Sequence, residues 1–520
     1  MTERKLPIGI QDFEYLRDNG YLYVDKTAYV HHLATTGKPY FLGRPRRFGK
    51  SLFLSTLKAY FEGKKALFEG LAIAGLEKDW TKYPVFYLDF NVGSHGSLPA
   101  LNNRLSVVLD AFEKVWGKTV ASDDPASRFA ALIEAAHGAS GQKVVVLVDE
   151  YDKPLIGMMD DLQSNDQIRN ALKGFYGVLK SMDAHLRFVF LTGVTKFSKV
   201  SIFSDLNQLQ DISLDRKYAG ICGVSEGEMR GTFMPEIDAL AKERDMSREA
   251  ALNELKKRYD GYHFAKESEG MYNPYSLLNT FAKQDFADYW YQTGTPTFLV
   301  KLIRNLQLDI RQFDNDVTIS ARDIDQYRHG ETSPIPILYQ SGYLTIKKYD
   351  RRFDEYVLGF PNEEVRYGFL GDLLPSYAPE GRIKGGEFAA SGFVKDLLAG
   401  RMDDFMTRLQ AFFATIPYDL SNKSERDYQT IFYLLFTLMG QFVETEVKSA
   451  HGRADAVVKT SDCIYVFEFK LEENGTAEAA LAQIDNKGYL IPFAADGRKL
   501  VKIGVEFSHD GRGVGRWLVE

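Results

Sequence analysis

Several features that mark other protein classes are scarce in this chain of 520 residues. Its two cysteines, Cys222 and Cys463, stand far apart, which excludes a disulfide framework or a cysteine-built zinc cluster. No run of about 18 apolar residues is free of charge, so no helix is expected to span a membrane. The first residues lack the apolar centre of a signal peptide, and we find no internal repeat. These absences favour a reducing cytoplasm.

Positive charge is also in deficit, because 64 basic residues face 71 acidic ones and the net charge is −7. This balance argues against a protein that coats nucleic acid by bulk attraction, although local basic clusters such as Arg44, Arg46 and Arg47 occur. Apolar residues are abundant, at 45% with 13% aromatic. A chain of this length exceeds one hydrophobic core, so two to four domains are expected.

Apolar strands alternate with amphipathic helices over the first part of the chain, residues 1–222. Short runs rich in Val, Ile, Leu and Phe with helical crossovers indicate a mostly parallel α/β sheet that is covered on both faces. Ligands of such sheets bind at the carboxyl ends of the strands. The predicted strands are 39–43, 85–90, 144–149, 187–192 and 209–214, and the helices between them include 51–61, 98–116, 126–139 and 168–182.

Residues 223–420 are expected to form a helical and mixed lid or connector. Ser225 and Glu228 have the spacing of a capping box, which opens a helical region up to about residue 306. Two tyrosine-rich segments interrupt it, at 259–264 and 272–276. Short strands are predicted within 334–358, followed by helices over 362–377 and 386–416.

A phosphate-binding loop is predicted between the first strand and the following helix. Gly49-Lys50-Ser51 would place backbone N–H groups and the Lys50 charge on phosphates, with the Ser51 hydroxyl as a Mg²⁺ ligand. The usual pattern begins with glycine, but Arg44 stands at that position and Gly43 lies one residue early. Without further support, the alternative is that Gly49-Lys50-Ser51 occurs here by chance.

Support for this loop comes from the strand at 144–149. It ends in Asp149 and Glu150, of which the first can hold Mg²⁺ and the second can orient or deprotonate the attacking water. Thr192, at the tip of another strand, is our candidate for a contact with the γ-phosphate. Solvated strand ends are the alternative interpretation. Together the motifs predict ATP binding with Mg²⁺, and ATP hydrolysis as a further step.

These strings resemble the AAA-ATPase-like family of bacteria and archaea. Further matches are Leu6-Pro-Ile-Gly-Ile10, Tyr23-Val-Asp-Lys-Thr27, Asp149-Glu-Tyr-Asp-Lys-Pro154, Thr192-Gly-Val-Thr-Lys196, Tyr259-Asp-Gly-Tyr262 and Tyr272-Asn-Pro-Tyr275. The resemblance accounts for Arg44, which stands in the family's own loop, and it implies that Asp25 and Lys26 flank the nucleotide. The expected nucleotide-binding residues of the loop are Arg44, Pro45, Arg46, Arg47, Phe48, Gly49, Lys50, Ser51 and Leu52.

The last part of the chain, residues 421–520, reads as a separate αβββαβ unit. Its predicted elements are a helix at 427–440, strands at 442–448, 453–459 and 463–470, a helix at 476–486 and a strand at 499–507. Asp455 is placed on the second strand, and Glu468 and Lys470 share one face of the third. The two carboxylates suit Mg²⁺, with Mn²⁺ as the alternative ion, and the lysine can act on the attacking water.

Further polar residues surround this trio. Gln483 and Lys487 share one helix face and are candidates for holding the nucleic-acid backbone or the water. A further metal-side acid is left open among Glu425, Glu444 and Glu446. The alternative is an exposed strand with a salt-bridged Glu–Lys pair.

The unit resembles PD-(D/E)xK nucleases of the type fused to AAA-like ATPases, over about residues 425–507. The matching residues are Gly452-Arg-x-Asp455, Phe467-Glu-Phe-Lys470 and Gln483-x-x-x-Lys487-x-Tyr489. RecB-type relatives have a tyrosine four residues after the glutamine, whereas Lys487 takes that place here and Tyr489 follows. The resemblance implies Asp455, Glu468, Lys470 and Gln483 as catalytic residues.

We therefore expect a P-loop NTPase sheet, a helical middle and a restriction-endonuclease-like unit. The leading hypothesis is a DNA-processing ATPase whose ATP state controls a metal-dependent nuclease, with a role in phage defence as one option. The rival is a nucleotide-switched interaction protein whose nuclease fold is inactive. Assembly of identical subunits is also expected, with Arg216 or Arg47 as an arginine supplied to a neighbour's site.

Overall fold

The computed structural model divides the chain into two compact units. Unit 1 comprises Met1–Thr293 and Asn315–Glu364, and unit 2 comprises Gly294–Asp314 and Val365–Glu520. The residues that the structure describes are 4–93, 96–156, 162–196, 208–293, 299–300, 302–303, 306, 308–314, 317–324, 333–377, 390–414, 425–440, 443–447, 454–472, 474–508 and 513–520, without the side chains of 162, 376–377, 425–429 and 446–447. The domain boundaries predicted at 222 and 420 stay predictions.

Unit 1 is built on a parallel sheet of five strands in the order β2-β3-β4-β1-β5. The predicted strand positions are confirmed, although the fifth strand is only two residues long. The phosphate-loop strand β1 and the acidic strand β3 lie on either side of β4. The strands are β1 (Pro39–Gly43), β2 (Val85–Asp89), β3 (Val144–Asp149), β4 (Leu186–Gly193) and β5 (Gln210–Asp211).

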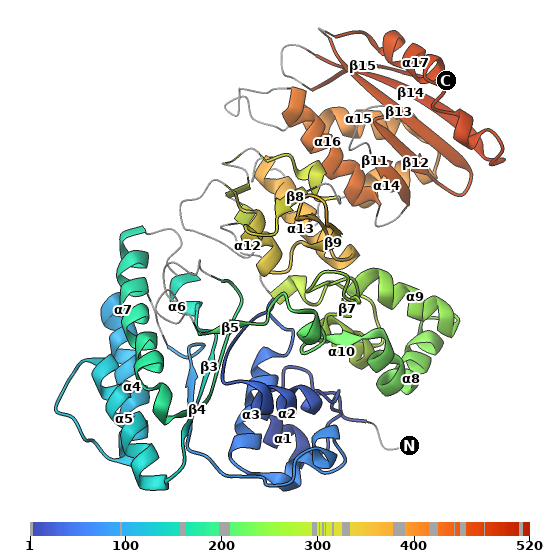
Figure 1. Ribbon diagram of the computed structural model, residues 1–520. Coiled ribbons are helices and arrows are strands. Elements are labelled where there is room, and N and C mark those ends of the chain that lie inside the picture. The colour runs from blue at the N-terminus through green and yellow to red at the C-terminus, as the bar shows by residue number, and fades with distance from the viewer. Residues whose placement is uncertain are drawn as a thin grey trace. The chain divides into compact units, whose positions relative to one another are not determined.

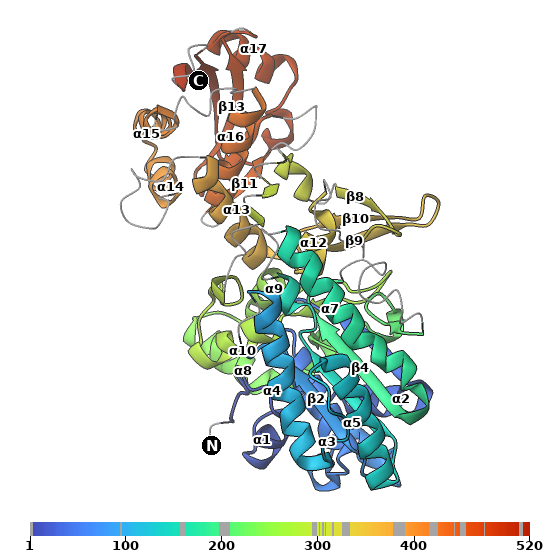
Figure 2. The same ribbon diagram turned by 90° about the vertical axis from the view of Figure 1, so that its left-hand side faces the viewer.

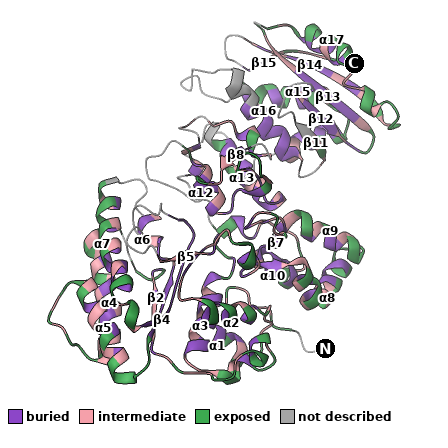
Figure 3. Ribbon diagram, viewed as in Figure 1, coloured by how far each residue is buried: buried purple, intermediate pink, exposed green. Residues whose placement is uncertain are grey.

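Helices cover both faces of this sheet, as Figure 1 shows. One face carries α1 (Phe13–Asp18), α2 (Thr27–Thr36) and α3 (Lys50–Phe61). The other carries α4 (Leu98–Trp116), α5 (Pro125–Ser140) and α7 (Leu162–Ser181), while the short α6 (Lys153–Ile156) follows β3. Every residue of β3 is buried, and the sheet is the interior of the unit (Figure 3). A fully buried central strand explains the unbroken apolar run at 144–148.

The remainder of unit 1 is helical with two small sheets. The predicted capping box is confirmed, because Glu228 N–H donates to the Ser225 hydroxyl and the Glu228 carboxylate accepts from Ser225 N–H. The helices are α8 (Glu226–Glu243), α9 (Arg248–Tyr259), α10 (Pro274–Lys283) and α12 (Ile335–Gln340). The strands are the pair β6 (Val224–Ser225) and β7 (Met271–Tyr272), and the antiparallel sheet of β8 (Val317–Ser320), β9 (Thr345–Asp350) and β10 (Glu355–Gly359).

Helix α12 corrects the prediction of a strand at the start of 334–358. Pro336 lies in its first turn, where a proline is tolerated because that N–H needs no helical partner. The apolar run Ile335–Gln340 is therefore a short buried helix, a case that apolar content alone does not distinguish from a strand. The strands of this region, β9 and β10, follow it.

Unit 2 contains four helices before its sheet and one helix within the sheet region, besides short turns, among the residues described. The predicted helix at 386–416 is wrong as a single element, because the chain breaks near Gly400, whose φ is +67°. The helices are α13 (Glu363–Tyr377), most of which belongs to unit 2, α14 (Ala390–Leu398), α15 (Met402–Ala414), α16 (Glu425–Met439) and α17 (Ala477–Asn486).

The sheet of unit 2 has five strands in the order β11-β12-β13-β14-β15, and only β13 and β14 pair in parallel. The predicted order αβββαβ is confirmed and extended by β15, which the sequence analysis missed. The strands are β11 (Glu444–Val447), β12 (Ala456–Lys459), β13 (Cys463–Leu471), β14 (Lys499–Phe507) and β15 (Val514–Val519). Figure 2 shows the long strand β13 within this unit.

Short 3-10 turns complete the described structure. They are η1 (Lys65–Phe68), η2 (Ala72–Gly75), η3 (Asp183–His185), η4 (Arg216–Tyr218), η5 (Tyr291–Thr293), η6 (Ile310–Phe313) and η8 (Ile491–Phe493). Within the ranges given above, no helix is long and apolar enough to cross a membrane.

Candidate functional sites

The loop between β1 and α3 has the geometry of a phosphate-binding loop. Gly49 is the N-cap of α3 and has φ +93°, a left-handed conformation that glycine adopts without steric cost. No side chain caps this end of the helix. The first N–H groups of α3, from Lys50 onward, are therefore directed out of the helix start, where an anionic ligand is favoured.

Lys50 lies at the centre of this loop and is almost fully buried, at 4% exposure. Its ammonium group donates to the carbonyl oxygens of Arg44 (3.0 Å) and Pro45 (3.2 Å). It also pairs with the Glu150 carboxylate at 3.2 Å. The structure thus brings together the predicted loop lysine and the predicted catalytic acid from two different strands of the sheet.

Asp149 joins the same site from the end of β3. Its carboxylate accepts a hydrogen bond from the Thr192 hydroxyl at 2.7 Å, and a bond with the Ser51 side chain lowers its pKa. Burial has the larger effect and raises the pKa of Asp149 above its ordinary value. Ser51, Asp149 and Thr192 are therefore neighbours, and a hydroxyl beside a buried carboxylate is a donor set that suits a hard divalent cation.

The side chain of Arg44 has a role that the sequence did not reveal. It is 1% exposed, and its guanidinium donates to the carbonyl oxygens of Gly43 (2.8 Å), Ser213 (2.8 Å) and Tyr218 (3.0 Å). The same group lies 4.2 Å from the centre of the Phe264 ring. These contacts favour a structural role, in which Arg44 ties the base of the loop to the chain beyond β5.

The outer side of the loop packs against the later segments of unit 1. The Phe48 ring meets the Tyr262 ring edge-on, with centroids 4.7 Å apart, and the Trp290 indole donates to the Arg46 carbonyl at 3.0 Å. A Cβ atom on Gly342 would lie 2.8 Å from the Pro45 side chain. Phe48 and Pro45 are therefore packing residues, and their predicted contact with a nucleotide stays a prediction.

Arg46 and Arg47 differ from their buried neighbours in the loop. Both are exposed, and Arg47 adopts φ +65° with its guanidinium 4.9 Å from the Tyr275 ring. Arg216, the other candidate for an arginine supplied to a neighbouring subunit, is also exposed, in η4. An arginine supplied to a neighbouring subunit must be exposed, and Arg47 and Arg216 both meet this requirement.

An open pocket with a cavity volume of about 90 Å³ lies beside the start of α3. Its lining is mainly apolar, and Lys26 lies in it with its ammonium 2.6 Å from Glu228 and 2.8 Å from the Gly220 carbonyl. Its position next to Gly49 suits a nucleobase, for which apolar walls are typical. Its other lining residues include Pro7, Leu22, Tyr23, Val24, Phe48, Leu52, Phe53, Cys222, Gly223 and Val224.

Asp25, the second residue implied to flank the nucleotide, supports the local backbone. One of its oxygens accepts from the N–H and the hydroxyl of Thr27, and the other accepts from Ala72 N–H at 2.7 Å. It thereby anchors the start of α2 to η2. Its predicted contact with the nucleotide stays a prediction.

The nuclease-like residues of unit 2 meet between β13 and α17. Lys470 donates to the Gln483 side-chain oxygen at 2.6 Å, and its ammonium lies 3.7 Å from the Glu468 carboxylate. The Gln483 amide nitrogen in turn donates to Glu468. Glu468 is 2% exposed. The predicted common face of Glu468 and Lys470 is confirmed, while Phe467 and Phe469 pack on the opposite side against Phe432 and Phe436 of α16.

Asp455 lies beside this face, and the structure corrects its placement. It immediately precedes β12 instead of lying within it, and its carboxylate accepts from Phe469 N–H at 2.9 Å. That bond holds Asp455 against the strand that carries Glu468. Carboxylate oxygens from the residue before β12 and from within β13, with a lysine alongside, are ligands that suit a hard divalent cation.

The remaining candidates around this trio are less central. Glu444 pairs with Lys459 at 2.5 Å, its partner in the sheet register, and is largely exposed. The side chains of Glu425 and Glu446, together with Gly452 and Arg453, lie outside the described residues. Lys487 ends α17 as its C-cap, whereas the Tyr489 hydroxyl lies 3.4 Å from the Gln483 amide. Among the described residues no group of three or more His, Cys, Asp or Glu forms a metal site.

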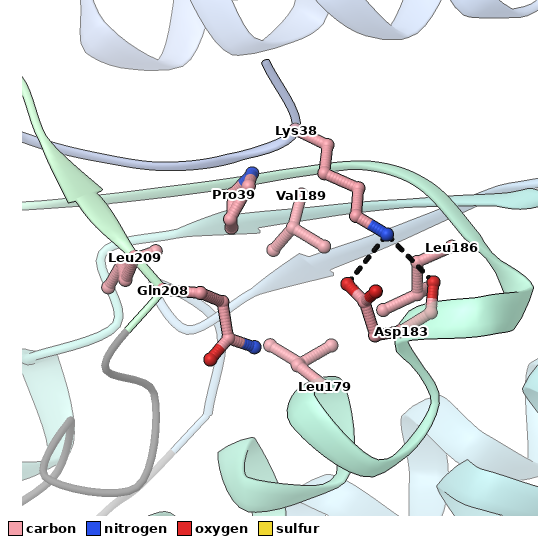
Figure 4. Close-up of a pocket in the computed structure, with 8 residues that line it drawn as sticks. All are labelled: Lys38, Pro39, Leu179, Asp183, Leu186, Val189, Gln208 and Leu209. Atoms are coloured by element: carbon pink, nitrogen blue, oxygen red, sulfur yellow. Dashed lines mark hydrogen bonds and ion pairs between the residues drawn. The ribbon is translucent and has the colours of Figure 1, made fainter.

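A second cavity lies at the opposite edge of the parallel sheet, near the first residues of β1 and β4 (Figure 4). Its polar feature is the ion pair of Lys38 with Asp183, at 2.6 Å. Leu179, Leu186, Val189 and Leu209 supply apolar walls. This end of a parallel sheet is not where ligands of such folds bind, and the described residues that line the cavity include no set of catalytic groups.

Comparisons with known proteins match two parts of the chain. A family model described as "Predicted AAA-ATPase" matches residues 7–203, and one described as "PD-(D/E)XK nuclease superfamily" matches residues 423–517. A protein of Azotobacter chroococcum mcd 1, described as "Uncharacterized protein in vnfD 5'region", is 38% identical over 530 aligned positions, which cover 100% of this chain and 99% of that protein.

A solved structure, that of the Aeropyrum pernix ORC2 protein in ADPNP–ADP complexes, also matches. It shares 12% identity over 65% of this chain and 88% of that chain, with a TM-score of 0.26. A likeness this distant carries no argument about activity.

The role of Arg44 generates a first prediction. Arg44→Gly restores the glycine of the usual phosphate-loop pattern, yet it should lower the free energy of unfolding by about 3 kcal/mol, because buried carbonyl groups lose charged hydrogen-bond donors. ATP affinity should fall with it, since the loop loses its anchor. Denaturant unfolding and calorimetry measure both. Arg46→Gly, at an exposed position of the same loop, is the matched control for stability, and equal stability of the two variants would contradict the structural role.

Proposed function

This chain belongs to the family of predicted AAA-ATPases and carries a C-terminal domain of the PD-(D/E)XK nuclease superfamily, and we propose that it hydrolyses ATP and cleaves DNA. One observation carries the ATPase proposal. Lys50, Ser51, Asp149 and Glu150 come from two separate strand–loop segments and meet at one edge of the sheet.

ATP binding follows from the chemistry of the loop and the pocket beside it. The start of α3 offers N–H groups to phosphate oxygens, and Lys50 exchanges its carbonyl and Glu150 contacts for the phosphates. The nucleobase enters the neighbouring pocket lined by Tyr23, Val24 and Val224. In this proposal residues 23–27 contact the nucleotide chiefly because Tyr23, Val24 and Lys26 line that pocket.

ATP hydrolysis needs a group that handles the attacking water. Ser51 and Asp149 would hold Mg²⁺, which neutralises charge on the phosphates when bound. Glu150 orients the water and accepts its proton, a role that opens once Lys50 has turned to the phosphates. Thr192, bonded to Asp149, keeps that carboxylate in place and approaches the γ-phosphate.

DNA cleavage is proposed for unit 2 on the network of Asp455, Glu468, Lys470 and Gln483. The two carboxylates would hold Mg²⁺ or Mn²⁺, which supplies Lewis-acid activation of the phosphodiester. Lys470 stabilises charge near the scissile phosphate and positions the water. Gln483 bonds both Glu468 and Lys470, so it fixes their relative orientation.

The two activities are proposed to be coupled, so that ATP in unit 1 controls the nuclease. Self-assembly with an arginine from a neighbour, a role in phage defence and a cytoplasmic location stay predictions. The rival function is a nucleotide-switched interaction protein with an inactive nuclease fold. The trio Asp455, Glu468 and Lys470 favours an active nuclease, because it is complete in this chain and a decayed module would be expected to have lost one of the three. The bonds of Gln483 to Glu468 and Lys470 orient two members of the trio.

Two variants of the nucleotide site should separate binding from hydrolysis. Lys50→Ala removes the charge on the phosphates and should weaken ATP binding at least tenfold, about 1.4 kcal/mol. Glu150→Gln keeps the size of the side chain but removes the base, so ATP should still bind while hydrolysis becomes slow. Calorimetry and phosphate release measure the two effects. Lys58→Ala, on an outward-facing position of α3, should change neither.

Unchanged ATP affinity in Lys50→Ala would disprove the phosphate-loop assignment. Wild-type hydrolysis in Glu150→Gln would instead place the catalytic base elsewhere.

Isosteric changes test the nuclease site without unfolding it. Asp455→Asn and Glu468→Gln should each reduce DNA cleavage by more than about 100-fold, since even partners in the outer shell of a metal site cost 10–100-fold. Lys470→Ala should reduce cleavage equally while sparing metal affinity, because lysine acts on the water. Glu444→Gln, whose partner is Lys459, serves as the control. If Glu468→Gln still cleaves DNA but has a lower melting temperature, these residues stabilise the fold and take no part in cleavage.

A further inference from the structure

The segment that follows Glu150 is fastened to the tip of β4 by a set of hydrogen bonds that we call the clasp. The clasp consists of Tyr151 and Asp152 on one side and residues 192–195 on the other. Tyr151 N–H donates to the Thr192 carbonyl at 2.9 Å, and the Tyr151 hydroxyl donates to the Thr195 carbonyl at 2.9 Å. The clasp therefore joins the ends of two neighbouring strands beyond the last pair of the sheet register.

Asp152 is the centre of the clasp. Its carboxylate accepts from Val194 N–H at 3.1 Å, from Thr195 N–H at 2.6 Å and from the Thr195 hydroxyl at 2.6 Å. The side chain is 0% exposed. Burial and the nearby Glu150 charge raise the pKa of Asp152 to about 6. Burying a carboxylate is costly unless it is hydrogen-bonded, and the three donors to Asp152 come from the two residues that follow β4, Val194 and Thr195.

The packing around Asp152 leaves little freedom. A Cβ atom on Gly193 would lie 2.5 Å from the Asp152 carboxylate and 2.6 Å from the Tyr151 ring. Only glycine allows the two segments to approach so closely. The position of the Asp152 carboxylate relative to β4 is therefore fixed by shape as well as by hydrogen bonds.

The clasp holds the two groups that the proposed hydrolysis uses. Glu150 adopts φ +51°, a left-handed conformation that is unfavourable for a residue with a side chain and persists where the surroundings impose it. Asp152 lies two residues beyond Glu150, and Thr192 lies two residues before Val194. The hydrogen bonds of the clasp therefore hold the Glu150 carboxylate and the Thr192 hydroxyl in fixed positions relative to each other.

We propose that Asp152 is a positioning residue for ATP hydrolysis, which orients Glu150 and Thr192 toward the γ-phosphate through the clasp. The inference rests on the proposed ATPase function. The Asp152 side chain hydrogen-bonds to Val194 and Thr195, which follow β4, and among the contacts of the described residues it interacts with the 44–51 loop through the Lys50 charge and not through a hydrogen bond. Its loss should therefore affect the rate of hydrolysis and not the affinity for ATP.

Asp152→Asn is the sharpest test because it preserves size. An asparagine offers one acceptor oxygen, and its NH₂ group would replace the carboxylate oxygen that now accepts from Val194 N–H at 3.3 Å, so two N–H donors would face each other there. We expect kcat to fall by about 10- to 100-fold, the scale of small misplacements of catalytic groups. ATP affinity should be unchanged or slightly tighter, because a negative charge near the phosphate site has been removed.

Thr195 provides a second variant and a rescue. Thr195→Val removes the hydroxyl that donates to Asp152 but keeps the backbone donor, so it should show a smaller fall in kcat. Thr195→Ser restores the hydroxyl and should recover the wild-type rate. The effects of Asp152→Asn and Thr195→Val should not add, because they act through one contact.

A buried aspartate outside unit 1 controls for stability alone. Asp396 is 3% exposed and accepts from Arg401 and Arg408, so Asp396→Asn should lower the melting temperature without changing kcat for ATP. Melting temperature, ATP affinity by calorimetry and steady-state hydrolysis are measured on the full chain for every variant.

The outcomes separate the positioning role from the function on which it rests. A fall in kcat at constant ATP affinity in Asp152→Asn and in Thr195→Val, together with a wild-type rate in Thr195→Ser, supports the positioning role. Wild-type kcat in Asp152→Asn, or a loss of ATP affinity equal to the loss of rate, overturns it. If Asp152→Asn does not fold, a wild-type rate in Thr195→Val overturns it instead. A wild-type chain that does not hydrolyse ATP would refute the proposed function itself.

Discussion

The parallel pairing of β3, β4 and β1 is the constraint on which the nucleotide site depends. In parallel strands the carboxyl ends meet at one edge, so the register that sets Leu42 beside Thr192 also sets Val148 beside Leu191. Glu150 then lies close enough to pair with Lys50, although the two residues stand a hundred positions apart in the sequence. Arg44 and the clasp then hold in place the loops that follow these strands at their carboxyl ends.

Unit 2 uses the alternation of a strand for a similar purpose. On β13, Phe467 and Phe469 pack against the rings of α16, and this burial leaves Glu468 and Lys470 facing α17. The apolar face thus holds the polar face in position, and Gln483 completes it. Both candidate sites are therefore consequences of regular secondary structure, supplemented by a few hydrogen bonds from residues outside it.

Much of this arrangement could be predicted from the sequence, because strand periodicity and short motifs carry it. The strands of unit 1, Gly49-Lys50-Ser51, Asp149-Glu150 and the common face of Glu468 and Lys470 are examples. The anchoring by Arg44 could not be predicted, since its acceptors are backbone carbonyls that have no sequence signature. Asp152 belongs to the string Asp149-Glu-Tyr-Asp-Lys-Pro154, but no role was predicted for it. A second acid three residues after Asp149 is the sequence feature that could have indicated one. Trp290 and Gly342 have no local sequence signal that predicts their packing against the loop.

The central claim is that nucleotide binding in one unit controls DNA cleavage by the other. Its most direct test is the cleavage rate of the wild-type chain on linear, circular and single-stranded DNA, with ATP, with ADP and without nucleotide, in Mg²⁺ or Mn²⁺. The account predicts cleavage of at least one form, with a rate that changes at least about tenfold between ATP and no nucleotide, or 1.4 kcal/mol in the barrier. Cleavage at the same rate with ATP and without nucleotide, or a folded chain that hydrolyses ATP yet cleaves none of these substrates, would contradict it.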